Sequence, residues 1–114
     1  MKEFMMIFRN ERNDAPQPSP EEMQQSVKLW NDWIGGIAAQ DKLVATDALG
    51  FEGQTVTKDT VVSDGPYVEV KEYIGGYTTV KAETLAEAVK MTKGCPIFLN
   101  GGTVEVRDVM VFDA

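Results

Sequence analysis

The sequence predicts one α+β domain, spanning residues 1–114, in which two helices cover one face of an antiparallel sheet. Strand-like and helix-like segments follow in the order strand, helix, strand with an inserted hairpin, strand, helix, strand. Both helices open with a capping box, in which a Ser or Thr is followed three residues later by Glu. This order is that of a ferredoxin-like split βαβ arrangement, and 114 residues are enough for one such core.

The first half of the chain is predicted to hold a buried strand and a long helix. Within residues 4–8 both alternating sets of side chains are apolar, which is typical of a strand covered on both faces. Residues 10–19 are polar and proline-rich, so we expect a loop there. A capping box that begins at Ser19 starts a helix that runs to about Gln40. Two glycines at 35–36 each cost that helix about 1 kcal/mol relative to alanine. Either the helix ends early or another element packs closely against it there, and we expect close packing on the sheet.

The second half is predicted to complete the sheet. Further strands are expected at residues 42–49, 54–57, 60–63, 72–81 and 103–112. The capping box at Thr84 begins a short helix, and Gly94 stands where a helix often ends. The apolar positions of the last strand change phase near Asp108, which predicts a β-bulge there.

The apolar strand positions outnumber those that one layer of helices can cover. The strand at residues 4–8 has apolar side chains on both faces, so the face away from the helices needs a cover of its own. A second sheet from an identical chain is the simplest cover, and we therefore expect a homodimer.

The run from Asp64 to Tyr77 concentrates polar groups beside unusual backbone. Gly65 and Pro66 favour a turn at its start. The glycines at 75–76 lie within a strand-like stretch, where a backbone or a ligand can approach closely. The rim of a binding pocket and an ordinary surface hairpin both fit this pattern.

This run resembles the motif of the YCII-related (DGPF-domain) family of small bacterial proteins. The matching residues are Asp64, Gly65, Pro66, Glu69, Lys71, Glu72, Gly75, Gly76 and Tyr77. Tyr67 replaces the usual Phe, and the resemblance extends over nearly the whole chain. It implies a dimeric α+β barrel. Better-known relatives carry a His–Asp pair, and since this chain has no histidine, the resemblance transfers no activity that depends on that pair.

Asp64 is the candidate catalytic residue. A carboxylate placed in a cleft between sheet and helix would have a raised pKa and could act as a general base. The alternative is that Asp64 caps its own turn through backbone N–H groups.

The candidate ligand-binding residues combine aromatic walls with polar groups. They are Trp30, Gly65, Pro66, Tyr67, Lys71, Glu72 and Tyr77. Tyrosines and a tryptophan give a pocket apolar walls, and Lys71 could neutralise an acidic ligand. Core packing of the aromatic residues and a solvated surface ion pair are the alternatives.

Composition excludes several classes of function. A net charge of −7 disfavours nucleic-acid binding. One cysteine and no histidine disfavour a zinc or copper site, so no metal or other cofactor is expected. No apolar run is long enough to span a membrane, and we expect a cytoplasmic protein.

The sequence therefore predicts a homodimer that binds a small molecule beside the motif. Two alternatives stay open. One is a weak enzyme that uses Asp64 for proton transfer on a small organic substrate. The other is a non-catalytic regulatory accessory module. The resemblance implies this alternative, because DGPF-domain proteins are often associated with transcriptional regulators.

Overall fold

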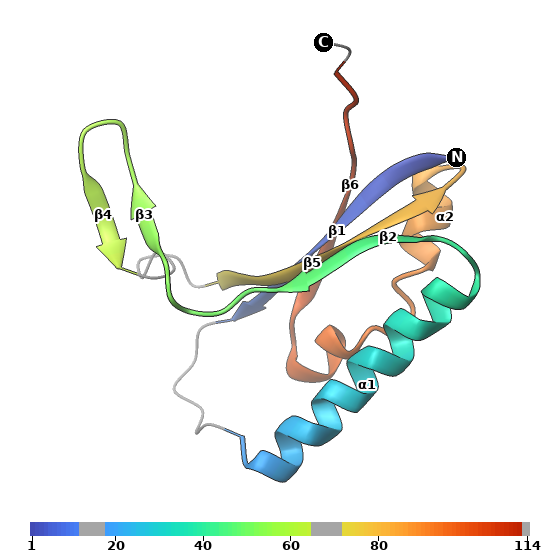
Figure 1. The fold of residues 1–114 in the computed structure, drawn as a ribbon, viewed down its shortest axis with the longest axis horizontal. Helices are drawn as coiled ribbons and strands as arrows, with labels where there is room; N and C mark the ends of the chain where they lie inside the picture. Colours follow the sequence, from blue (N-terminus) through green and yellow to red (C-terminus); the bar gives the residue numbers. More distant parts are fainter. Residues whose placement is uncertain (12–17, 65–71, 113–114) are drawn as a thin grey trace.

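The computed structural model describes residues 1–11, 18–64 and 72–112, without the side chains of residues 61–64. Within these ranges the chain forms a four-stranded sheet, a separate two-stranded hairpin, two α-helices and one 3-10 helix (Figure 1). In chain order the elements are β1 (Lys2–Glu11), α1 (Pro20–Ala39), β2 (Leu43–Ala48), β3 (Gln54–Val56), β4 (Val61–Asp64), β5 (Glu72–Ala82), α2 (Leu85–Lys90), η1 (Pro96–Asn100) and β6 (Thr103–Asp108).

The main sheet has the strand order β2-β5-β1-β6, and all its neighbouring strands are antiparallel. The two central strands, β1 and β5, are also its longest. Because β1 connects through α1 to β2, with β5 paired between them, the topology is the ferredoxin-like arrangement that the sequence predicts. The predicted hairpin is present as β3 and β4, which pair only with each other among the described residues.

Both helices begin at the predicted N-cap residues, and each N-cap hydroxyl accepts the backbone N–H three residues later. At the start of α1 the backbone N–H of Glu22 donates to Ser19 Oγ at 3.1 Å. At the start of α2 the backbone N–H of Glu87 donates to Thr84 Oγ1 at 3.1 Å. The helix α1 also ends where expected, with Gln40 as its C-cap.

The expected close packing at the two glycines of α1 is wrong. Gly35 and Gly36 remain helical, and a Cβ atom built on either one would meet nothing within 4 Å. These glycines therefore lower the helix propensity of α1 without admitting a close neighbour among the described residues.

The hydrophobic core lies between the sheet and the layer formed by α1, α2 and η1. Alternate residues of β1 supply its centre, and each of the three helical elements contributes side chains. Its buried members are Phe4, Met6, Phe8, Ile37, Val80, Ala82, Ala88, Cys95 and Ile97. Of these only Ile37 belongs to α1. The first half of α1 is far less covered, since Met23 and Val27 remain 55% and 58% exposed.

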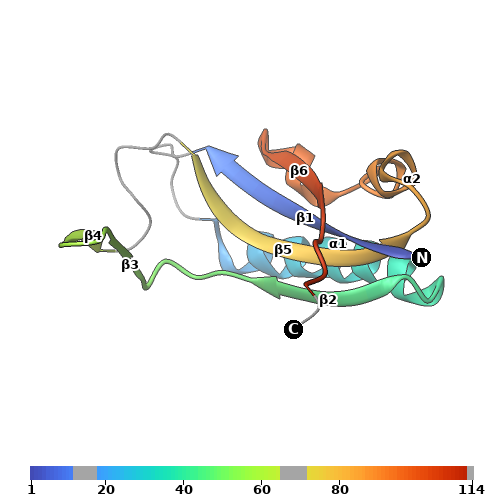
Figure 2. The same ribbon diagram turned by 90° about the horizontal axis from the view of Figure 1, so that it is seen from above.

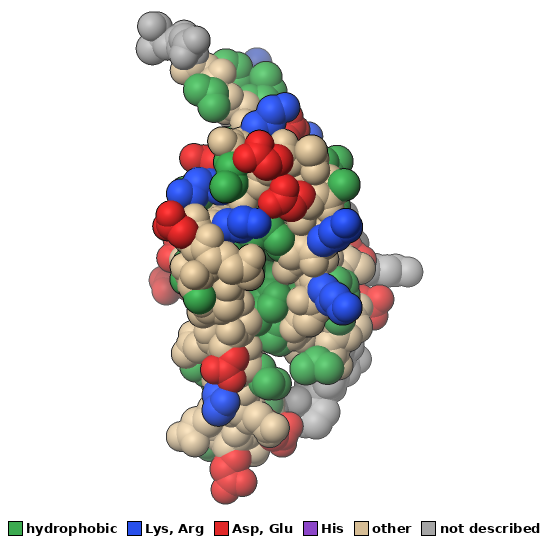
Figure 3. Space-filling model, turned by 90° about the vertical axis from the view of Figure 1, so that its right-hand side faces the viewer, with side chains coloured by type: hydrophobic (Ala, Val, Ile, Leu, Met, Phe, Trp, Pro, Cys, Tyr) green, Lys and Arg blue, Asp and Glu red, His purple; other side chains and the backbone are tan. Residues whose placement is uncertain are grey.

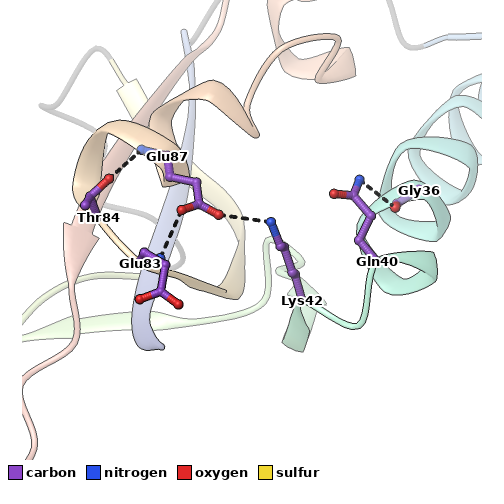
Figure 4. A network of polar contacts seen from close by, with 6 residues as sticks. All are labelled: Gly36, Gln40, Lys42, Glu83, Thr84 and Glu87. Carbon is purple, nitrogen blue, oxygen red and sulfur yellow. Dashed lines mark hydrogen bonds and ion pairs between the residues drawn. The ribbon is translucent and has the colours of Figure 1, made fainter.

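A polar network joins Lys42, in the connection between α1 and β2, to the start of α2 (Figure 4). Lys42 Nζ lies 3.0 Å from Glu87 Oε1, and the backbone N–H of Glu83 donates to Glu87 Oε2 at 3.2 Å. The hydrogen bond from Lys42, followed by that from Glu83, lowers the pKa of the Glu87 carboxyl. Glu87 thus serves as a capping residue and as the ionic link between two segments 45 residues apart.

The last strand is shorter than the sequence predicts, and the bulge expected near Asp108 is absent. β6 pairs with β1 in one continuous register from Thr103 to Asp108. The backbone N–H of Val109 makes one further bond to Glu3 O at 3.0 Å, and the chain then leaves the sheet. The phase change that suggested a bulge instead marks the exit of residues 109–112.

The face of the sheet opposite α1 is called here the open face. Figure 2 looks onto it, with the strands in front of α1. The strand register places Met5, Ile7, Tyr77 and Thr79 on this face, because these positions alternate with the core residues. No helix or sheet among the described residues packs on the open face.

Candidate functional site

A cleft of about 520 Å³ lies between the middle of α1, from Ser26 to Ile34, and the sheet. The helix forms one wall, the ends of β1, β2 and β5 form the other, and η1 closes one end. The residues that line it are Phe8, Asn10, Ser26, Val27, Trp30, Asn31, Ile34, Thr46, Asp47, Ala48, Gly75, Gly76, Ile97 and Asn100.

Two glycines of β5 line the sheet side of the cleft and admit close neighbours there. A Cβ atom on Gly76 would lie 2.7 Å from Asp47 O and 3.2 Å from Ala48 Cα, both backbone atoms of β2. A Cβ atom on Gly75 would lie 2.7 Å from Asn10 Nδ2. The expectation that these glycines admit a close neighbour is therefore confirmed, and at Gly76 that neighbour is β2.

Trp30 supplies the aromatic wall. Its ring meets the ring of Phe8 edge-on, with centroids 5.0 Å apart, and that of Trp33 with centroids 5.8 Å apart. Both tryptophans pack against Phe8, but Trp30 lines the cleft and Trp33 does not. The three rings hold one another in place, so the indole of Trp30 is a preformed surface.

The polar side chains of the cleft are neutral. Asn10, Asn31 and Asn100 come from β1, α1 and η1, and Ser26 and Thr46 add hydroxyl groups. Thr46 Oγ1 lies 2.8 Å from the hydroxyl of the buried Thr78. Amide groups both donate and accept hydrogen bonds, so this lining can bind an uncharged polar ligand.

Asp47 is the one ionisable residue among the described residues that line the cleft. It pairs with Tyr77 in the β2–β5 register, and the Tyr77 hydroxyl donates to Asp47 Oδ2 at 2.5 Å. Since Tyr77 is on the open face, the carboxylate of Asp47 points there as well, and the backbone of Asp47 faces the cleft. This hydrogen bond is the main cause of the raised pKa of Tyr77, and partial desolvation adds to it.

The structure brings only some of the predicted site residues near the cleft. Trp30 lines it. Glu72 is exposed at the start of β5, opposite Glu11, and Tyr77 is on the other face of the sheet.

The remaining predicted residues belong to the first part of the motif. Asp64 ends β4, where its backbone pairs opposite Gln54, and its side chain is outside the described part of the structure. Gly65, Pro66, Tyr67 and Lys71 also lie outside the described residues.

The comparison with family models decides the relationship of this chain to known proteins. The model of the YCII-related domain matches residues 3–113, which is nearly the whole chain. The chain belongs to the YCII-related family. A comparison with curated proteins found no match.

This YCII-related domain has no described feature that would hold a metal ion. Over residues 1–11, 18–64 and 72–112, no three His, Cys, Asp or Glu side chains gather into a possible metal site. In the same ranges, no helix is long and apolar enough to cross a membrane.

Cys95 of the YCII-related domain is buried beside η1. Burial raises the pKa of its thiol to about 11, so the thiolate is scarcely populated near neutral pH. Cys95 therefore acts as a small core residue.

Sequence reasoning missed the asparagines of the cleft. Asn10, Asn31 and Asn100 come from three elements and have no characteristic spacing. The one local signal is at Asn100, which precedes Gly101 at φ 77° and the buried Gly102. A Cβ atom on Gly102 would lie 2.7 Å from Arg9 O, so this turn seats η1 against the end of β1.

Proposed function

We propose that this YCII-related domain binds a small molecule in the cleft between α1 and the sheet. The observation that carries the proposal is the pairing of Trp30 with the bare backbone of Gly75 and Gly76 across one cleft. A flat apolar wall opposite strand backbone that carries no side chains, with neutral polar side chains at the edges, is a usual composition of a ligand site. A volume of about 520 Å³ is in the range of small-molecule pockets.

The motif run contributes to this site through β5. Its described part, from Glu72 to Tyr77, includes both glycines of the cleft. Glu72 stands only three residues before Gly75, a separation of about 10 Å along an extended strand. We therefore keep Glu72 in the proposal, together with Gly65, Pro66, Tyr67 and Lys71 of the same motif, as candidate ligand-binding residues.

A weak enzyme that uses Asp64 for proton transfer is the alternative. Catalysis of this kind needs a titratable group at the ligand. The described lining offers only Asp47, whose carboxylate is bonded to Tyr77 on the open face. Binding without catalysis is therefore preferred. The alternative predicts that Asp64→Asn abolishes turnover of a bound ligand while its affinity persists.

We also propose that two copies of the domain associate through their open faces. One chain exposes 8518 Å², whereas a compact monomer of 12.6 kDa would expose about 6200 Å². The radius of gyration is 15.8 Å, compared with about 13 Å for a compact domain of this length. The excess area is larger than the roughly 800 Å² that each partner buries in an interface of standard size.

The charges around the open face favour a second copy as the partner. Arg9 and Arg107 both contact Glu105 at the β6 edge, so positive and negative groups alternate there. A surface that carries both signs can be complementary to itself across a twofold axis. The net charge of −7 disfavours nucleic acid as the partner, because its phosphate backbone is also negative.

Two single-tryptophan variants test the binding proposal. Trp33→Phe leaves Trp30 as the reporter in the cleft, and Trp30→Phe leaves Trp33 as a matched reporter outside it. Both reporters are on α1 and both contact Phe8. In a screen of small aromatic and amide-containing compounds, ligands should change the fluorescence of Trp30 far more than that of Trp33. Equal responses from the two reporters, or no response to any compound, would contradict the proposed site.

A further inference from the structure

Four consecutive apolar residues follow β6 and remain exposed. We call Val109–Phe112 the C-terminal arm. Its side chains are 36%, 69%, 86% and 81% exposed in sequence order, so exposure is high from Met110 onward. A run of exposed apolar residues is unfavourable in water unless something covers it.

The arm stands on the same side of the sheet as the open face. In Figure 1 it rises from the end of β6 away from α1, and in Figure 2 it passes in front of the strands. Figure 3 shows the molecule narrowing toward its top to a projecting end that bears hydrophobic side chains. The arm does not pack on its own sheet, because its last three side chains are at least 69% exposed.

The length of the arm matches the spacing of two packed sheets. Four extended residues reach about 13 Å, and the backbones of two sheets packed face to face lie about 10 Å apart. An arm that extends perpendicular to its own sheet is therefore long enough to reach a second sheet packed on the open face. Met5 and Ile7 at the centre of that face are half-buried and apolar, which suits them to receive such side chains.

We propose that the C-terminal arm of each copy packs on the open face of a second copy, so that two arms are exchanged across the dimer. This inference rests on the proposed homodimer and adds the element that holds it together. A second copy fits as the partner because every copy has one C-terminal arm and one open face. Each arm can therefore pack on the open face of the other copy. The excess of exposed area over that of a compact monomer, about 2300 Å², is enough for both surfaces to be buried.

Truncation after Asp108 tests the role of the arm. The truncated chain keeps every residue of β6, so circular dichroism should show an unchanged fold. Analytical ultracentrifugation should show a dissociation constant for the dimer about a hundredfold higher than that of the full chain. Should the truncated chain fail to fold, Phe112→Ser provides the same test and should weaken the dimer about tenfold.

Leu99→Ser is the matched control for Phe112→Ser. Leu99 is a large apolar residue, 73% exposed, on η1 at the helical side of the sheet. Its replacement should leave the dissociation constant unchanged. Equal weakening by both substitutions would mean that general surface hydrophobicity drives association, which would overturn the arm exchange.

Disulfide trapping identifies where the arm lies. A copy carrying Phe112→Cys is mixed with a differently tagged copy carrying Ile7→Cys, and oxidation should join the two tags covalently. Cys95 is only 2% exposed and should not react, and a copy carrying Lys58→Cys on the β3–β4 turn should give no such product.

The outcomes separate the two proposals. A full chain that is monomeric at micromolar concentration overturns both the homodimer and the arm exchange. A truncated chain that dimerises as tightly as the full chain, or a dimer without the trapped disulfide, overturns the arm exchange alone and leaves the open-face dimer standing.

Discussion

The hydroxyl of Tyr77 and the carboxylate of Asp47 are joined by a hydrogen bond of 2.5 Å on the face of the sheet opposite α1. The bond links the edge strand β2 to β5 through side chains 30 residues apart. It also directs both polar groups away from the cleft, whose other polar side chains are neutral. The cleft is thus walled by Trp30 and bare backbone, while Tyr77 belongs to the surface proposed to meet a second copy.

Tyr77→Phe should leave ligand affinity in the cleft unchanged. Its effect should instead be seen at high pH. Because the hydrogen bond raises the folded pKa of Tyr77 above the ordinary value of 10.0, its stabilisation is present below that value and is lost as pH rises through the raised pKa. Absorbance titration near 295 nm should show one tyrosine that ionises late in the wild type. That late step should be absent from Tyr77→Phe and shifted to lower pH in Asp47→Asn.

Gly76→Ala should destabilise the fold by about 1–3 kcal/mol. The new Cβ atom would lie 2.7 Å from Asp47 O. This oxygen is a backbone atom of β2, so it cannot move away by a side-chain rotation. Gly75→Ala is the control, since its nearest neighbour is the end of the Asn10 side chain, which can rotate. Chemical denaturation measures both variants. A smaller loss for Gly76→Ala than for Gly75→Ala would contradict the close approach of β2.

Gly35→Ala should stabilise the domain by about 1 kcal/mol. Gly35 is an interior residue of α1, and a Cβ atom there would meet nothing within 4 Å. Gly94→Ala is the control with the opposite expected sign. Gly94 also has nothing within 4 Å of a built Cβ atom, but its φ is +81°. This variant should destabilise by about 1 kcal/mol, since left-handed backbone disfavours a Cβ atom. Thermal unfolding should therefore shift upward for the first variant and downward for the second.

Glu87→Gln should lower the stability of the fold at neutral pH. It should also reduce the further decrease in stability that the wild type shows as the pH becomes acidic. Lys42 and the Glu83 backbone hold the folded pKa of Glu87 below its ordinary value of 4.5. The resulting stabilisation is present above that value and disappears as pH falls through the lowered folded pKa. Melting temperatures measured from pH 3 to 7 should converge at the acid end for wild type and variant. Glu83→Gln is the control, because Glu83 joins the network through its backbone N–H.

The parts of the fold that depend on local sequence could be predicted. The caps at Ser19 and Thr84 join residues three apart, so the chain specifies them without reference to the rest of the molecule. The exit of the chain after Asp108 could not be predicted, because an apolar run looks the same in a buried strand and in an exposed arm. The free space beside Gly35 likewise could not be predicted. It depends on which elements pack against α1, and helix propensity carries no information about that packing.

Only the aromatic part of the candidate site could be predicted. Trp30 stands out by residue type and by its place on an amphipathic helix. Asn10 and Asn100 are brought together by the pairing of β1 with its neighbours and by the turn before β6, and these are long-range contacts. The bond between Tyr77 and Asp47 depends on the β2–β5 register, so its position on the open face could not be read from either residue alone.

Filling the cleft tests the proposed binding site most directly. Ser26 is half-buried and lines the cleft, whereas its neighbour Gln25 is exposed and does not. Ser26→Phe and Gln25→Phe therefore each place a phenyl ring on the same turn of α1, but only the first places it in the cleft. A small aromatic compound found to bind the wild type should be titrated into both variants by isothermal calorimetry. We expect Ser26→Phe to abolish binding and Gln25→Phe to retain the wild-type affinity; full affinity in Ser26→Phe would contradict a site between α1 and the sheet.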